Sequence, residues 1–142
     1  MIFSQQLMFS DQQAITATAP STNVIDLGAT SAPPGDAAAL TRDIGIGDTV
    51  PLLIQITEAF DNLTSLDIAL QVDDNSGFAS AKEVWSQTIL LADLVAGARP
   101  NIQGIPPGVD ERYARLNYTV AGTAPTVGKI TAGVNMGVQN DY

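Results

Sequence analysis

The fold is decided by residues 66–73, LDIALQVD, in which apolar and polar side chains alternate with a period of two. Leu66, Ile68, Leu70 and Val72 fall on one face of an extended chain, and Asp67, Ala69, Gln71 and Asp73 fall on the other. The next residues, 74–77 (DNSG), are turn formers, because Asn and Gly tolerate positive φ. The pattern predicts a half-buried strand that ends in a tight turn, which is typical of an antiparallel sheet.

Alternation of the same kind recurs along the chain, and no long helix is indicated. The predicted strands cover residues 22–27, 49–57, 83–89, 101–105, 113–120 and 126–138. Residues 30–48 predict a long loop in which 37–40 could form one helical turn, and residues 90–95 fit either a helical turn or a strand end. Short strands joined by turns predict an all-β fold, either a jelly roll or another antiparallel β-sandwich, over residues 21–142 as a single domain.

Residues 1–20 do not share this pattern. Ile2, Phe3, Leu7 and Phe9 are apolar but follow neither a clean strand alternation nor a helical stripe. We therefore expect an extended N-terminal arm that lies against a partner and has no role in the core. The first positive charge is Arg42, so the start of the chain lacks the basic residues of a secretory signal peptide, and we expect synthesis in the cytoplasm.

The composition excludes most catalytic chemistries. The chain of 142 residues contains no cysteine and no histidine, which excludes thiolate nucleophiles, zinc–thiolate sites, serine–histidine triads and most haem or copper sites. Its 15 acidic and six basic residues give a net charge of −9, so nucleic acid and anionic membranes are disfavoured partners. No apolar run reaches the ~20 residues of a membrane span. We expect a non-enzymatic protein with no cofactor and no small-molecule substrate.

Two acidic motifs are candidates for chemistry. Asp73 and Asn75 could supply alternate oxygen ligands to a calcium ion, but the positions that an EF-hand loop fills with glycine and glutamate hold Phe78 and Val84. A hairpin turn explains the same residues. The motif at 110–112, Asp-Glu-Arg, carries two carboxylates, but neighbouring residues on a strand point in opposite directions and would not converge. Neither motif predicts a catalytic residue.

Longer motifs resemble a known family. Residues 9–19 (FSDQQAITATA), 21–28 (STNVIDLG) and 106–118 (PPGVDERYARLNY) are similar to the capsid cement, or decoration, proteins of tailed bacteriophages of the Bordetella-phage type. Residues 42–45 (RDIG), 70–74 (LQVDD) and 128–133 (GKITAG) fit the same resemblance. It implies a jelly-roll protein that forms homo-oligomers, with a dimer favoured over a trimer. It also implies binding to the outer surface of the capsid, where the protein would clamp neighbouring subunits of the major capsid protein.

Partner contacts would then come from the apolar arm and from the turn before a predicted strand. The candidate residues are Ile2, Phe3, Leu7, Phe9, Arg112, Tyr113 and Arg115. An acidic chain is poorly placed against packaged DNA, which favours the outer face of the virion. The alternative is a carbohydrate-binding β-sandwich, a lectin- or adhesin-like module that would use Trp85, Tyr113 and the Asp73–Asn75 turn. The fold class alone does not separate the two functions.

Overall fold

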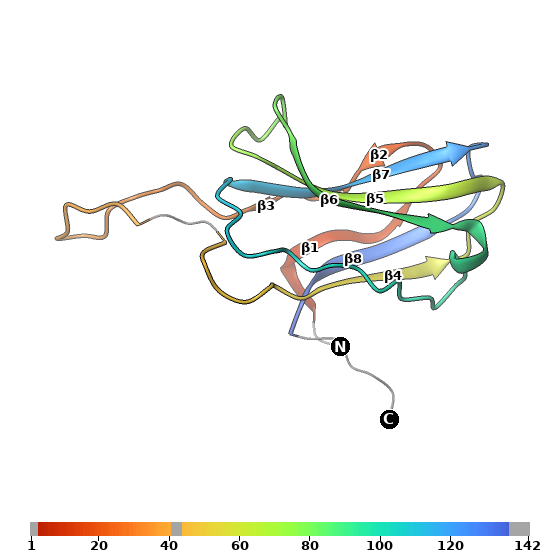
Figure 1. Ribbon diagram of the computed structural model, residues 1–142, viewed down its shortest axis with the longest axis horizontal. Coiled ribbons are helices and arrows are strands. Elements are labelled where there is room, and N and C mark those ends of the chain that lie inside the picture. The colour runs from red at the N-terminus through yellow and green to blue at the C-terminus, as the bar shows by residue number, and fades with distance from the viewer. Residues whose placement is uncertain (1–2, 41–43, 137–142) are drawn as a thin grey trace.

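The computed structural model describes residues 3–40 and 44–136, which form two antiparallel sheets packed face to face (Figure 1). The strands are β1 (Phe3–Ala14), β2 (Ala19–Pro20), β3 (Ile25–Asp26), β4 (Leu52–Glu58), β5 (Leu63–Asp73), β6 (Lys82–Leu90), β7 (Tyr113–Gly122) and β8 (Lys129–Asn135). One 3-10 turn, η1 (Leu91–Asp93), lies between β6 and β7. Strands and isolated bridges make up 49% of the described residues, so the predicted all-β sandwich is confirmed. Within the described ranges, no helix is long and apolar enough to span a membrane.

The strand order is that of a jelly roll. One sheet has the order β1-β8-β4, and the other has the order β2-β7-β5-β6, with β3 also pairing with β7. Residues 97–105 extend the first sheet beyond β4, because Ile56 N–H donates to the Ala98 carbonyl, and Val50 and Ile105 exchange two hydrogen bonds of 2.9 Å. The first strand, β1, therefore pairs with the last, β8, and β2 and β3 pair with β7. β4 pairs with residues 97–105, and β5 forms a hairpin with β6, which is the order that the jelly-roll prediction requires.

The core lies between the two sheets and uses the faces that the alternation predicts. The buried side chains on the inner faces include Leu66, Ile68, Leu70 and Val72 of β5, Ile54 and Ile56 of β4, and Ile130 and Ala132 of β8. On the opposite face of β5, Asp67 and Gln71 remain partly exposed. The inward face predicted for β5 is therefore confirmed, and on the outward face Ala69 and Asp73 are buried as well.

The N-terminal segment departs from the expectation. Residues 3–14 form β1, an edge strand that pairs with β8, and Phe9 and Ile15 are fully buried in the core. An arm over residues 1–20, separate from a domain over 21–142, is therefore wrong for the described part of that segment. Three register shifts interrupt the pairing of β1 with β8, so its side chains do not keep one period of two and the strand escapes sequence-based prediction.

Smaller departures occur at loops and strand ends. Residues 37–40 form no helical turn, and Leu40 instead bridges to Ser31. The ambiguous end of β6 is resolved as η1. The strand predicted over 101–105 is reduced to the bridge at Ile105, because the prolines at 100 and 106 cannot donate to a ladder. β8 ends at Asn135, and residues 137–138 of the predicted strand lie outside the described residues.

A polar network ties β1 to the opposite sheet. The Tyr118 hydroxyl of β7 lies 2.8 Å from Ser10 Oγ of β1, and Ser10 Oγ donates to Gln13 Oε1 at 2.7 Å. Gln13 also accepts from the Thr22 N–H and donates to the Pro20 carbonyl. Because Ser10 Oγ gives its one proton to Gln13, the Tyr118 hydroxyl is the donor in its contact with Ser10. Burial raises the pKa of Tyr118. Side chains as well as the ladder therefore hold β1 in place.

Replacing Leu70 by Ala should lower the free energy of unfolding by about 2–5 kcal/mol, because its fully buried side chain would leave a cavity between the sheets. Val95→Ala is the control, since Val95 is 52% exposed and its truncation should change stability by less than about 0.5 kcal/mol. Urea denaturation measures both values. Equal effects in the two variants would mean that β5 turns its other face to the core.

Ser10→Ala should destabilise the protein more than Tyr118→Phe does. The serine variant leaves a buried Tyr118 hydroxyl without its partner, which costs about 1–3 kcal/mol. The phenylalanine variant removes that hydroxyl, and Ser10 keeps its bond to Gln13, so the cost is about 1 kcal/mol. Thermal unfolding of both variants gives the order, and the reverse order would contradict the role given to the network.

Candidate functional site

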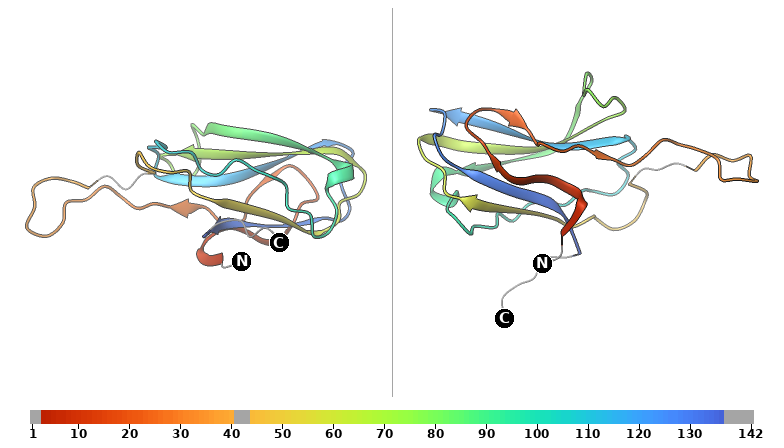
Figure 2. Two further views of the ribbon diagram at one scale, coloured as in Figure 1. Left: turned by 60° about the horizontal axis from the view of Figure 1, so that its bottom comes forward. Right: turned by 180° about the vertical axis from the view of Figure 1, so that it is seen from behind.

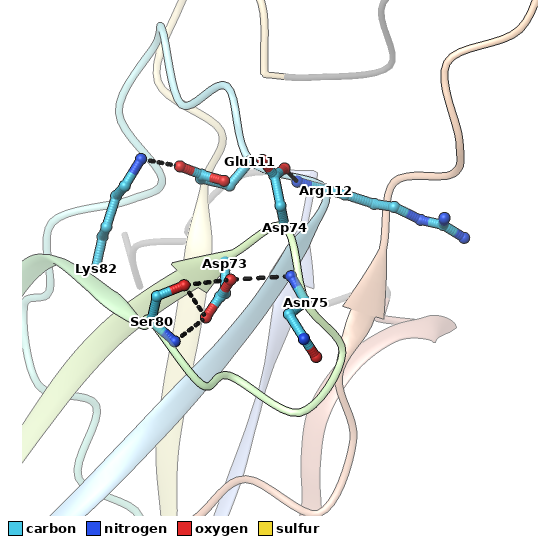
Figure 3. Close-up of polar contacts among 7 residues, drawn as sticks. All are labelled: Asp73, Asp74, Asn75, Ser80, Lys82, Glu111 and Arg112. Carbon is cyan, nitrogen blue, oxygen red and sulfur yellow. Dashed lines mark hydrogen bonds and ion pairs between the residues drawn. The ribbon is translucent and has the colours of Figure 1, made fainter.

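The polar candidate residues gather at one end of the sandwich, where β5 ends and β7 begins (Figure 3). Asp73 closes β5, and Asn75 stands in the turn after it. Asp73 lies directly opposite Tyr113 in the register of the two strands, with Arg112 just before β7. The antiparallel pairing of β5 and β7 thus unites two motifs that are far apart in the sequence.

The apolar candidates are not gathered in one place. Phe9 is fully buried and is not available to a partner, which corrects the expectation for that residue. Phe3 is half-buried beside Gly133 of β8, and Leu7 is 36% exposed at the rim of an apolar pocket. Ile2 lies outside the described residues. Among the described members of this set, Leu7 has the highest fractional exposure.

The Asp73 carboxylate closes the turn between β5 and β6. It accepts hydrogen bonds from the Asn75 N–H at 2.9 Å and the Ser80 N–H at 2.8 Å, and from the Ser80 hydroxyl (Figure 3). These bonds, that from the Asn75 N–H foremost, lower the pKa of the buried Asp73. Asn75 Oδ1 accepts from the Gly77 N–H at 2.8 Å. Both residues proposed as calcium ligands therefore have a structural role in the turn itself.

Arg112 and Arg115 are both bound within the chain. Arg112 forms a bidentate ion pair with Asp26 of β3, with Nε–Oδ1 and Nη2–Oδ2 distances of 2.7 and 2.8 Å, and its guanidinium lies 4.8 Å from the Tyr113 ring. Arg115 donates to Gln71 at 3.0 Å, and its guanidinium lies 4.1 Å from the centroid of the Phe78 ring. These contacts brace β3 and the turn after β5.

Glu111 is a buried carboxylate beside these residues. It pairs with Lys82 at the start of β6, whose side chain is largely exposed (Figure 3). The bond to Glu111 raises the pKa of Lys82. Asp110, its neighbour in the sequence, is exposed, so the two carboxylates do not converge. Across the described residues, no group of three or more acidic side chains could hold a metal ion.

The same contacts surround the base of the long loop between β3 and β4. Leu27 N–H donates to the Arg112 carbonyl, and Ile44 N–H donates to the Val109 carbonyl, both at 2.9 Å. Gly28 N–H donates to Asp26 Oδ1 at 2.7 Å, which joins the loop to the ion pair with Arg112. The loop itself projects away from the sandwich (Figures 1 and 2). The Asp26–Arg112 ion pair and these backbone hydrogen bonds therefore fix the position at which the long loop leaves the sandwich.

An apolar pocket of about 190 Å³ lies beside the residues at the base of the long loop. Its lining includes Leu7, Ile25, Leu27, Ile44, Val50 and Val109, together with the buried Glu111. Leu27 and Ile44 pack against the core from the two sides of the loop. The hydrophobic contacts and the ion pairs thus anchor the loop together.

The aromatic residues of the carbohydrate alternative do not meet. Trp85 is the register partner of the buried Leu70, so it faces inward, and its indole N–H donates to the Gly104 carbonyl at 3.1 Å. Tyr113 pairs with Asp73 on the opposite face of the sheet and lies beside Arg112. A sugar could not stack on both rings at once, so the structure does not favour a site built from these residues.

Sequence reasoning missed the partners that matter at this end. It identified Arg112, but not Asp26 as its partner, because the two residues are 86 positions apart and no local pattern joins them. It gave no role to Lys82 and treated Glu111 as half of a carboxylate pair. Glu111 lies between two predicted strands and near one basic residue in the sequence. That pattern is too common to predict its ion pair with Lys82.

Acid should destabilise the protein partly through Asp26. The ion pair with Arg112 lowers the pKa of Asp26 from 3.8 to about 2. A carboxyl group whose pKa is lower in the folded state than in the unfolded state contributes its full stabilisation at pH values above the unfolded pKa. For Asp26 that contribution is lost as the pH falls from about 4 through 2. Asp26→Asn should therefore be less stable than wild type at pH 6 and lose less stability on acidification.

Thermal unfolding of both proteins between pH 6 and pH 2 measures this difference. Asp61 and Asp73 also have lowered pKa values, so the variant keeps part of the slope. Identical slopes in the two proteins would show that the Asp26–Arg112 pair does not contribute to stability in solution.

Comparison with known proteins identifies a family. A family model, Bbp16, matches residues 9–134, which is most of the chain. The match includes β1 from Phe9 onward and the end of the sandwich where β5 ends and β7 begins, here called the loop end. No curated protein matches the chain. The matched family is one of Bordetella phage proteins, in agreement with the resemblance seen in the sequence motifs. The chain belongs to the Bbp16 family of phage proteins.

Proposed function

We propose that this phage protein is a capsid cement protein, which binds the outer surface of an assembled shell and stabilises contacts between subunits of the major capsid protein. Its membership of the Bbp16 family over residues 9–134 carries the proposal. The resemblance of residues 9–28 and 106–118 to cement proteins supplies the specific role. The jelly-roll order of the strands agrees with that resemblance.

The loop end of the sandwich supports a role in protein binding. Asp26 is engaged with Arg112, Glu111 with Lys82, and Asp73 with the turn before Ser80. These pairs hold the adjoining loops in one arrangement. A preorganised surface binds a protein partner with a smaller loss of conformational entropy than a mobile one does.

The charge supports a place on the outside of the shell. A chain with a net charge of −9 is repelled by packaged DNA and has few cations to offer to phosphates. A protein that binds the assembled shell and not the free subunits stabilises the assembly by mass action. Many copies on a symmetric shell add their contacts, so each contact can be modest.

Removal and restoration of the protein on particles tests the proposal. Particles stripped of the protein should melt at a lower temperature than native ones, and added protein should restore the native value. Heat-denatured chain at the same concentration is the control. Equal thermal stability with and without the folded protein would refute cementing, and binding on a glycan array would then favour the carbohydrate alternative.

A further inference from the structure

The apolar pocket beside the base of the long loop is large for a void next to a protein core. Its volume is about 190 Å³. Protein interiors are close-packed, with few voids larger than a water molecule. An engineered apolar cavity of about 150 Å³ stays dry and binds benzene or xenon. The pocket therefore has room for one aromatic ring.

The chemistry of the lining disfavours water as the occupant. Nine of the ten lining residues are aliphatic, and Glu111 is the tenth. The Glu111 side chain is buried and already accepts a hydrogen bond from Lys82. An ordered water in a cavity needs about two to four polar partners, which these side chains do not supply. The lining therefore favours a neutral apolar molecule over water.

The walls of the pocket are fixed by backbone pairing. Val50 and Ile105 exchange two hydrogen bonds of 2.9 Å, and Ile44 N–H donates to the Val109 carbonyl at 2.9 Å. All four residues line the pocket. β3 and β7, which supply two further lining residues, pair with each other. A void closes only as far as its walls can move, so this pocket is preformed, as most small-molecule sites are.

The pocket lies where the packing of the core ends. Five of its aliphatic residues pack against the core but remain only partly buried: Leu27, Ile44, Val50, Val109 and Val134. Leu7 is the most exposed lining residue, at 36%. It precedes Met8 in the part of β1 where the register with β8 is shifted, so the strand ladder holds this wall least firmly. A ligand would therefore enter past Leu7.

We propose that this pocket is a binding site for a small neutral apolar molecule of about the size of one aromatic ring. The proposal does not depend on the cement function, because its evidence is the pocket itself. An occupant would contact β1, β3, β7, β8 and the base of the long loop together. A ligand that binds the folded state and not the unfolded one stabilises the fold by mass action. Occupancy would therefore stabilise the loop end.

Thermal unfolding with benzene as the probe tests the site. Benzene should raise the unfolding temperature of the wild-type protein in a saturable manner. Val109→Phe and Ala114→Leu add carbon atoms to the lining from two different walls, and each should abolish that rise. The matched control is Val127→Phe, which makes the same change at a 45% exposed residue outside the lining. It should respond to benzene as wild type does.

Methyl NMR on the wild-type protein locates the probe without any substitution. In protein labelled with ¹³C at the isoleucine δ1 methyl groups, the benzene ring current should shift the signals of Ile25, Ile44 and Ile105, which line the pocket. The signal of Ile89 is the control, because this buried residue lies next to η1 and outside the pocket. It should not move. This readout decides the proposal even if a filled variant does not fold.

Three results would overturn the proposal. One is the absence of a saturable change up to the solubility limit of benzene, or a shift of Ile89 equal to that of the lining methyl groups. Another is a full thermal response in both filled variants, since benzene would then bind elsewhere. The third is a wild-type response that disappears as the protein concentration is raised, because a second copy would then fill the pocket in place of a small molecule.

Discussion

The antiparallel pairing of β5 with β7 is the constraint on which the rest of the structure depends. Its register runs from Leu63 opposite Gly122 to Asp73 opposite Tyr113. Along the chain, the two strands are separated by residues 74–112, which include β6 and η1. Such long-range pairing carries a loop-closure entropy that the apolar area buried between the sheets must offset. The inner faces of the two strands supply much of that area. The same register brings the turn after β5 beside the start of β7, which creates the loop end.

At that end, opposite charges hold the backbone segments together. Lys82 and Arg112 each pair with a carboxylate there, and Arg115 lies over Phe78. A further pair, Lys129 with Glu58, joins β8 to β4 at the opposite end of the sandwich. These cations therefore serve the fold, which leaves a surplus of acidic groups and a strongly negative molecule. An exposed ion pair alone contributes little to stability, but the Asp26–Arg112 pair is bidentate and is joined to the backbone of the loop base. The result is a body that is well fixed where the loop leaves it.

Local alternation predicts the strands whose pairing is regular, and it fails where pairing is irregular. The inner face of β5 follows one period of two, and Leu70 is buried as expected. β1 carries register shifts, so the sequence pattern predicts an arm at Phe9 although this residue belongs to the core. At the candidate site, the sequence marks Arg112 but not its partner, because a contact across 86 positions is set by the topology. Asp73 was correctly placed at a turn, and the hydrogen bonds that it accepts could be assigned only once the shape of that turn was known.

The edges of the two sheets explain why partner contacts would fall to loops. The register shifts of β1 and the bulge in the β5–β6 pairing beside Leu70 disturb the ladders near the free edges, and β6 begins with Lys82 and Glu83. Bulged and charged edges resist the addition of a strand from another chain. A partner that cannot extend either sheet is left with the sheet faces and the loops. Among the loops, residues 28–40 stand clear of both sheets (Figure 1), and the bonds from the Leu27 N–H to the Arg112 carbonyl and from the Gly28 N–H to Asp26 hold the base of that segment in place.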